Sequence, residues 1–229
     1  MPSAIRHALS ILTLLVCSAA TAVQAAEPAP DVLLEKAMHT MVHELNAQRD
    51  AIARDPAVVQ QLAERILLPH VDFVAASRQV LGKHWRRASR EQKLAFVRQF
   101  RTLLLRFYST ALAKYLRENT LDPAMFVFAP LRGDTSSGQI TVHMELHPPG
   151  GGKPIPVNYL MHHSKKGWRV YDLAIDGVSL IATYRNSFAS QIRKEGLDAL
   201  IARLAEKNAR LESTAQESGE EPSSASQAG

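Results

Sequence analysis

Cysteine is almost missing from this chain, which has one thiol, Cys17, among 229 residues. Cys17 lies in an apolar run, Ala8 to Val23, that follows the basic residue Arg6 and precedes small residues around Ala25. This order of basic, apolar and small residues is typical of a cleavable secretory signal. We therefore expect residues 1–25 to be a signal peptide, and the mature protein to fold without disulfides in an oxidising compartment.

Long apolar stretches are also missing after this segment. The run before Ala25 spans about 16 residues and contains serine and threonine, so it is a poor membrane span, and no later stretch approaches the roughly 18 residues required. A lipid-anchored alternative would use Cys17 as the acceptor, but Val16 is bulky where such signals have a small residue. The sequence thus predicts export followed by release in soluble form.

Catalytic motifs are missing as well. The pentapeptide Gly177 to Ile181 resembles a nucleophile elbow around Ser179, but Ile181 replaces the glycine that the sharp turn needs. We expect Ser179 to be a hydroxyl near a helix start. The glycine run 150–152 resembles a phosphate loop, but Pro154 replaces the Ser or Thr that would hold magnesium, so a hairpin loop is the better interpretation. We predict no catalytic residues.

Histidine supplies the strongest candidates for metal ligands, and the pattern argues against a site. The candidates are His39, His43, His143, His147, His162 and His163. The first two share a predicted helix face, but the glutamate of the zinc-protease helix would have to follow His39, whereas Glu44 follows His43. His143 and His147 lie on the polar face of an alternating strand. We favour surface histidines and predict no metal and no cofactor.

Charge separates the end of the chain from its body. Residues 210–229 are rich in Ser, Glu and Gly and poor in large apolar groups, so we expect a disordered polar tail. The body, residues 26–209, is one predicted domain and is basic. Its basic residues gather at Lys83, Arg86, Arg87 and Arg90 and again at Arg98, Arg101 and Arg106. A solvated helix face is the favoured interpretation, with an acidic partner or anionic lipid as the alternative. No nucleic-acid-binding motif is present.

The periodicity of apolar residues changes once along the body. From Asp31 to Leu121 they recur at spacings of three and four, which predicts amphipathic helices with breaks at Asp55-Pro56 and Pro69 and an N-cap at Ser89. Helix returns from Val178 to Lys194, stops at Gly196 and resumes from Leu197 to Lys207.

Between these helices, from Met125 to Ile175, the period is two. Ile140, Val142, Met144 and Leu146 alternate with polar residues. Connections rich in glycine, proline or lysine occur at 133–138, 148–154 and 165–167, so we predict a four-stranded antiparallel meander. The fold class is therefore α+β. Strict alternation would place Val170 on the face opposite to Leu173.

The most specific stretch of the chain runs from Trp168 to Leu204. Its characteristic residues are Trp168, Val170, Tyr171, Asp172, Gly177, Val178, Ser179, Tyr184, Arg185, Phe188, Gly196, Leu197 and Leu200. Earlier, a proline-broken helix leads to a turn at Val80-Leu81-Gly82, an aromatic residue and a serine that caps a long helix. These features resemble the MlaC family of periplasmic phospholipid-binding proteins, also called toluene-tolerance proteins. The resemblance covers about Asp31 to Leu204.

The resemblance implies a fold and a function. It implies a curved, four-stranded antiparallel sheet of the NTF2-like kind, wrapped by N-terminal and C-terminal helices, with an apolar pocket between them. It implies a periplasmic carrier, with phospholipid as cargo, that shuttles lipid between an outer-membrane lipoprotein-porin complex and an inner-membrane ABC transporter with its periplasmic substrate-binding subunit. Outer-membrane lipid asymmetry would be maintained in this way. A diacyl lipid exposes about 30 CH₂ groups at about 0.8 kcal/mol each, on the order of 20 kcal/mol in water, so a carrier must enclose the tails.

The pocket walls expected from this resemblance come from two helices before the sheet, from the strands and from the closing helix. From the helices before the sheet they are Val74, Val80, Leu81, Phe100, Leu104, Phe107 and Tyr108; from the strands, Val142, Met144, Val157, Tyr159, Met161, Val170, Leu173 and Ile175; from the closing helix, Val178, Ile181, Tyr184 and Phe188. Some of these must belong to the ordinary core, because an error of one residue in register exchanges the two faces of a strand.

Two other classes of function stay open. An NTF2-like enzyme acting on an apolar small molecule would use Asp172 or Asp176 as a base and Tyr171 as an oxyanion donor. A protein-binding adaptor would hold its partners on an apolar surface. The residues alone favour a fully packed interior, and it is the family resemblance that favours a pocket.

Overall fold

We describe the protein from a computed structural model. The structure describes residues 27–217, so the predicted signal peptide and residues 218–229 of the predicted tail lie outside the described residues. The helices are α1 (Pro30–Ala47), α2 (Arg49–Arg54), α3 (Ala57–Ile66), η1 (Leu68–His70), α4 (Phe73–Leu81), α5 (Lys83–Arg87), α6 (Arg90–Glu118), η2 (Pro123–Met125) and α7 (Leu180–Glu217). The strands are β1 (Phe126–Phe128), β2 (Gln139–Leu146), β3 (Ile155–Ser164), β4 (Gly167–Ile175) and β5 (Val178–Ser179).

The expected helix boundaries follow from local chemistry. Pro56 separates α2 from α3, because the ring of proline disfavours helical backbone in the residue before it. Helix α6 begins after a capping box, in which the Ser89 hydroxyl accepts from the Gln92 N–H and the Gln92 side chain accepts from the Ser89 N–H. These two predictions from sequence are confirmed.

The sheet is an antiparallel meander with the strand order β1-β2-β3-β4-β5. The prediction of four strands was therefore one strand short. The additional strand, β5, consists of Val178 and Ser179, which pair with Ile175 and Ala174 of β4. These two residues were expected to begin the closing helix, which instead begins at Leu180. A two-residue strand has no detectable alternation, so periodicity alone does not reveal it.

A β-bulge changes which residues of β4 share a face. Tyr159 lies opposite Leu173, whereas Met161 lies opposite Val170, and the register shifts between Leu160 and Met161. Directly opposite residues of an antiparallel pair point to the same side of the sheet, so the bulge brings Val170 and Leu173 to one face. The expectation that they lie on opposite faces was wrong, because it assumed an unbroken alternation.

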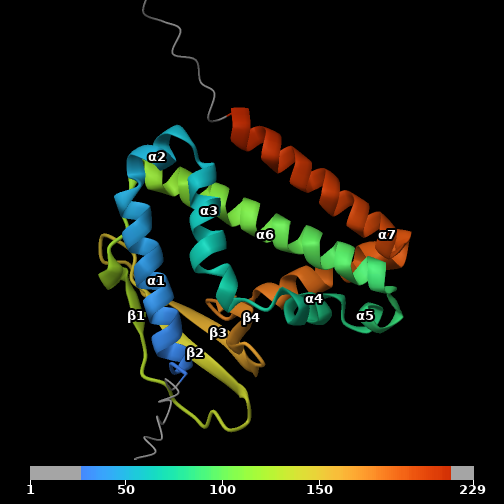
Figure 1. Cartoon of the computed structure of the whole chain (residues 1–229), viewed down its shortest axis with the longest axis horizontal. Coiled ribbons are helices and arrows are strands. Elements are labelled where there is room, and N and C mark those ends of the chain that lie inside the picture. The colour runs from blue at the N-terminus through green and yellow to red at the C-terminus, as the bar shows by residue number, and fades with distance from the viewer. Residues whose placement is uncertain (1–26, 218–229) are drawn as a thin grey trace, which may run out of the picture.

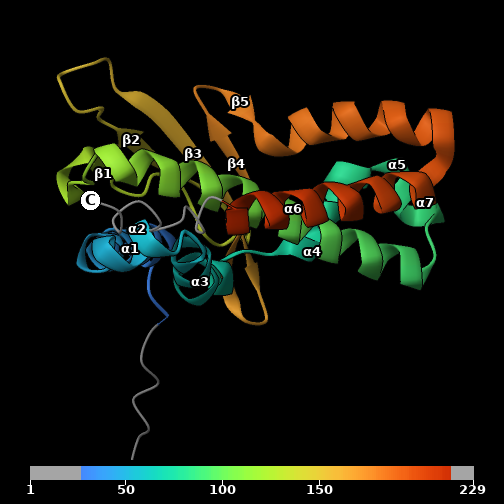
Figure 2. The ribbon, with the colours of Figure 1, turned by 90° about the horizontal axis from the view of Figure 1, so that it is seen from above.

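Helix α7 consists of two segments joined at Gly196, where φ is 87°. The stop expected at this glycine is confirmed. The second segment runs back along α6 (Figures 1 and 2), where the Asn208 side chain donates to Gln99 and Arg106 bonds to the Asn208 carbonyl and to Glu212. The helix continues to Glu217, so the predicted disorder is wrong for residues 210–217.

The helices pack on one side of the sheet, with α1 crossing β1 and β2 and the long helix α6 lying between α3 and α7 (Figure 1). Three apolar clusters form the interior. Cluster A joins α1, α2, α3 and the second half of α6, cluster B joins α4, the first half of α6 and α7, and cluster C joins Leu34 of α1 to β2, β3 and β4. Because α6 contributes to both helical clusters, it holds them side by side above the sheet.

Candidate functional site

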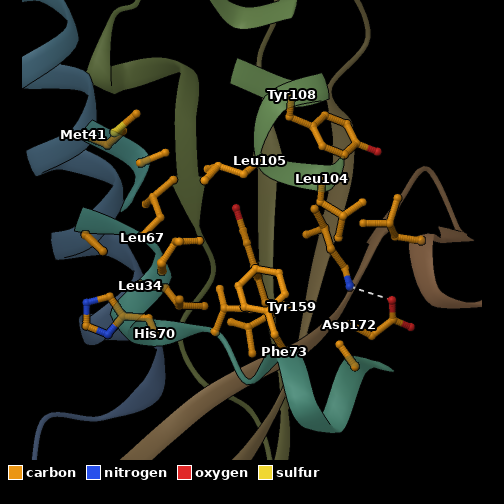
Figure 3. A pocket seen from close by; sticks show the side chains of 18 of the residues that line it. Leu34, Met41, Leu67, His70, Phe73, Leu104, Leu105, Tyr108, Tyr159 and Asp172 are labelled. Atoms are coloured by element: carbon orange, nitrogen blue, oxygen red, sulfur yellow. Dashed lines mark hydrogen bonds between the residues drawn. The ribbon is translucent and has the colours of Figure 1, made fainter. Parts of the chain in front are cut away.

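An apolar cavity of about 370 Å³ lies where the three clusters meet (Figure 3). Its wall includes Met41 and Leu105 from cluster A, Ile181 from cluster B and Leu34 and Val170 from cluster C. Small-molecule sites in proteins span about 300–1,000 Å³ and are lined mainly by apolar side chains. Both the size and the lining of this cavity therefore suit an apolar ligand.

Helical spacing builds the two long walls. On α1, Leu34, Ala37, Met38 and Met41 line the cavity at intervals of three and four residues, so they form one stripe of the helix. On α6, Leu104, Leu105, Tyr108, Ser109 and Leu112 do the same. Helix α3 adds Val59 and Ala63, and the segment around η1 adds Leu67, Leu68, His70 and Val71.

The sheet supplies the floor through Tyr159 of β3 and Val170 and Leu173 of β4. The β4 bulge allows both Val170 and Leu173 to face the cavity, since a regular strand would present only one of them. Phe73 and Ala76 of α4 border the floor.

Few polar groups line the cavity, and Asp172 is the one carboxylate among them. One of its oxygens accepts from the Ser179 hydroxyl at 2.6 Å, and the other accepts from the backbone N–H groups of Leu173 and Ile181, at 2.8 and 3.1 Å. Ser179 in turn accepts from the Ala182 N–H, which confirms the prediction of a hydroxyl at a helix start. Asp172 therefore joins β4 to the first turn of α7, and its oxygens are already engaged.

Burial shifts the acid–base properties of three side chains in the wall. Removal from water raises the pKa of the Tyr159 phenol and, less strongly, that of the Tyr108 phenol. Burial also lowers the pKa of His70, and the positive charge of Arg169 adds to this effect. All three groups are therefore neutral near pH 7. None of these three side chains therefore places a charge in the cavity wall.

Four of the six candidate histidines each bond to one other side chain. His143 bonds to Asn158, His147 to Glu145, His162 to Asp72 and His163 to Glu27. Within residues 27–217, no group of three or more His, Cys, Asp or Glu side chains is arranged to hold a metal ion. No helix in the same range is long and apolar enough to cross a membrane.

The structure places six of the residues expected in the pocket together in the cavity wall. They are Leu104, Tyr108, Tyr159, Val170, Leu173 and Ile181. They come from α6, β3, β4 and α7, four elements that are distant in the sequence, and their meeting depends on the packing of α6 across the sheet.

The other expected pocket residues lie elsewhere. Val80, Leu81, Phe100, Tyr184 and Phe188 belong to cluster B, Val142 and Met161 belong to cluster C, and Met144 and Val157 are buried in β2 and β3. Val74, Phe107, Ile175 and Val178 are exposed at the surface. Phe100 lies inside cluster B, whereas Leu104, one turn later on α6, packs at the border of this cluster and also lines the cavity.

Sequence reasoning missed the contribution of the first helices. Leu34, Met38 and Met41 on α1 and Val59 on α3 line the cavity, and none was among the expected residues. Their spacing of three and four residues predicts an apolar stripe, which is the signal that could have found them. The stripe alone does not say whether it faces a cavity or a packed core.

Comparison with known proteins gives a consistent result. The family model described as MlaC protein matches residues 35–206. The intermembrane phospholipid transport system binding protein MlaC of Haemophilus influenzae is 26% identical over 181 residues, which cover 78% of this chain and 82% of the relative. The toluene tolerance protein ttg2D of Pseudomonas putida is 26% identical over 160 residues, covering 69% and 70%.

A solved structure shares the fold. The phospholipid-binding protein from Ralstonia solanacearum, determined in complex with a phospholipid, matches with a TM-score of 0.71 and 27% sequence identity. The match covers 81% of this chain and 99% of that protein. On the family match, this chain belongs to the MlaC family.

Proposed function

We propose that this protein binds a phospholipid by its acyl tails in the cavity and carries it between membranes. The observation that supports this most directly is the apolar cavity at the junction of the three clusters, with Asp172 already bonded within the fold. The names of the relatives, a phospholipid transport binding protein and a phospholipid-binding protein, point to the same ligand.

The energetics of the interior favour a filled cavity. The lining is mainly apolar and the cavity opens at the surface, so without a ligand these side chains face water or unfilled space. Removing apolar surface from water is favourable by about 25 cal/mol per Å². An apolar ligand that fills this space would therefore stabilise the folded protein.

Tyr108 marks the opening of the cavity. Its side chain lines the cavity and is also 44% exposed. The neighbouring Phe107 is 46% exposed, and the two rings meet edge to face at 5.2 Å. Acyl tails that enter here would leave the hydrated phosphate group outside, where it keeps its water.

The cellular role follows from this proposal. The carrier works in the periplasm after removal of residues 1–25. It exchanges lipid with an outer-membrane lipoprotein-porin complex and with the periplasmic substrate-binding subunit of an inner-membrane ABC transporter, and so maintains outer-membrane lipid asymmetry. No chemical step is required of this protein, because exchange follows the relative affinities of the carrier and its partners.

Lipid extraction tests the proposal. Mature protein purified from the periplasm without detergent is expected to yield about one phospholipid per chain when extracted with organic solvent and quantified by mass spectrometry. Leu104→Trp replaces a leucine of the wall by the bulkier indole ring, which reduces the space for a ligand. It is expected to reduce the bound lipid severalfold. Leu94→Trp is the control, since Leu94 lies on the same helix and is 61% exposed.

The outcomes separate the competing functions. Wild-type protein without lipid would contradict the proposal, and a stable complex with another protein in place of lipid would favour an adaptor. Equal lipid content in Leu104→Trp and Leu94→Trp would show that the lipid binds outside this cavity.

A further inference from the structure

The Tyr159 hydroxyl is a polar group inside an apolar cavity. Tyr159 lies in the middle of β3, and its ring stacks on Phe128 at 6.2 Å. Figure 3 shows the side chain rising from the sheet with its oxygen pointing into the cavity. Tyr159 is partly buried, and among residues 27–217 the structure records no hydrogen bond to its hydroxyl.

Acyl tails that enter the cavity would remove this hydroxyl from water, so it needs a new hydrogen-bond partner in the bound state. A polar group removed from water without a hydrogen bond destabilises the state that contains it, whereas phenylalanine would contact acyl tails equally well. Protein partners are not at hand, since the oxygens of Asp172 are engaged by Ser179, Leu173 and Ile181. In the empty cavity water can bond to the hydroxyl, and bound acyl tails would displace that water.

The chemistry of the ligand proposed above limits what this partner can be. A diacyl phospholipid has its charged oxygens in the head group and only hydrocarbon in its tails. Between them lie two ester carbonyls, which are hydrogen-bond acceptors without charge. A phenol that is neutral near pH 7 donates one hydrogen bond and so matches a carbonyl oxygen.

We propose that the Tyr159 hydroxyl donates a hydrogen bond to an ester carbonyl of the bound lipid, so that the cavity selects ester-linked diacyl lipids over ether-linked analogues. This assignment rests on the proposed function and adds a specificity-determining residue to it. This hydrogen bond would also place the glycerol end of the lipid inside the opening, with the tails extending past the Tyr159 ring.

A competition between two lipids tests this assignment. Full mature protein is equilibrated with vesicles that contain equal amounts of a diacyl phosphatidylethanolamine and the dialkyl ether analogue of the same chain length. Bound lipid is then extracted and the ester-to-ether ratio measured by mass spectrometry. Wild type is expected to be enriched about tenfold in the ester, because the ether analogue lacks carbonyl oxygens and offers only its weaker ether oxygens to a hydroxyl that the tails have removed from water.

Tyr159→Phe is expected to bring the ester-to-ether ratio of the bound lipid to about one. A loss of packing alone would lower the uptake of both lipids together and leave the ratio unchanged. Tyr115→Phe is the matched control, since Tyr115 is a partly buried tyrosine of cluster A that does not line the cavity. This variant should keep the wild-type ratio.

A second measurement needs no variant at Tyr159. Lipid labelled with ¹³C at the ester carbonyls should show, when bound to wild type, a carbonyl stretching band shifted to lower frequency than the same lipid in hydrocarbon solvent. Equal uptake of both lipids by wild type, an unshifted band, or a preference that persists in Tyr159→Phe would overturn the assignment alone. Uptake of neither lipid would overturn the proposed function as well.

Discussion

Single side chains in the cavity wall acquire properties that their neighbours in the sequence do not predict. Phe100 and Leu104 lie one turn apart on α6, yet Phe100 is fully buried against Tyr184 and Phe188 whereas Leu104 lines the cavity. The sequence predicts that both are apolar and inward-facing. It does not specify what lies opposite each, because that depends on where α3, α4 and α7 meet α6.

His70 makes stability depend on pH. Burial and the charge of Arg169 lower the pKa of His70 below its usual 6.5, so the unfolded chain binds a proton more readily than the folded protein. This histidine therefore costs no stability above pH 6.5 and reduces stability as pH falls below 6.5. Urea unfolding at pH 7.5 and 5.5 is expected to show a smaller loss of unfolding free energy in His70→Gln than in wild type.

His39→Gln is the control for this measurement, since His39 is exposed on α1. It should keep the pH dependence of wild type. Some dependence should persist in His70→Gln, because burial also lowers the pKa of His84. An identical loss of stability in His70→Gln and wild type would contradict the assigned role of His70.

At the scale of elements, boundaries with a local chemical signal were predictable and those set by strand pairing were not. The capping serine Ser89 and the helix stop at Gly196 follow from residue type. Strand β5 and the bulge that turns Val170 toward the cavity depend on what β4 meets across the sheet. The same alternation in sequence is compatible with a regular or a bulged strand. The residues that form the floor of the cavity therefore could not be predicted from the sequence.

Gly196 allows the two segments of α7 to pack against each other and against α6. Its φ of 87° and ψ of 171° lie in a region that only glycine adopts readily. Gly196→Ala is expected to lower the free energy of unfolding by about 1–3 kcal/mol, although no atom lies within 4 Å of the added methyl group. Urea unfolding measures this loss.

Gly152→Ala is the matched control, since Gly152 has no positive φ and its added methyl group would make only ordinary contacts with Pro148. Its stability should stay within about 0.5 kcal/mol of wild type. Equal stability of the two variants would mean that α7 can bend at this point with an L-residue.

At the scale of the whole molecule, the proposed lipid binding would be coupled to folding through the cavity. A ligand that binds only the folded state stabilises it by about 2.7 kcal/mol when its free concentration is 100 times the Kd. Removing bound lipid by organic extraction and refolding is therefore expected to lower the thermal midpoint by several degrees. Calorimetry before and after delipidation, and after reloading from vesicles, measures the shift.

Reloading is the control for damage during extraction, because it should restore the original midpoint. Leu104→Trp should have a smaller difference between its two forms than wild type. An unchanged midpoint after complete removal of lipid would indicate that the cavity closes without a ligand, as a fully packed interior would require.

Helix α6 spans 29 residues without a break and contributes to both helical clusters. Because α6 lies between clusters A and B, the two clusters can change their spacing as side chains repack, while the backbone hydrogen bonds of α6 stay intact. Opening of this kind costs much less than global unfolding. On the proposed function, lipid would leave through local movements around α6. The same molecule could then be emptied and refilled without passing through a denatured state.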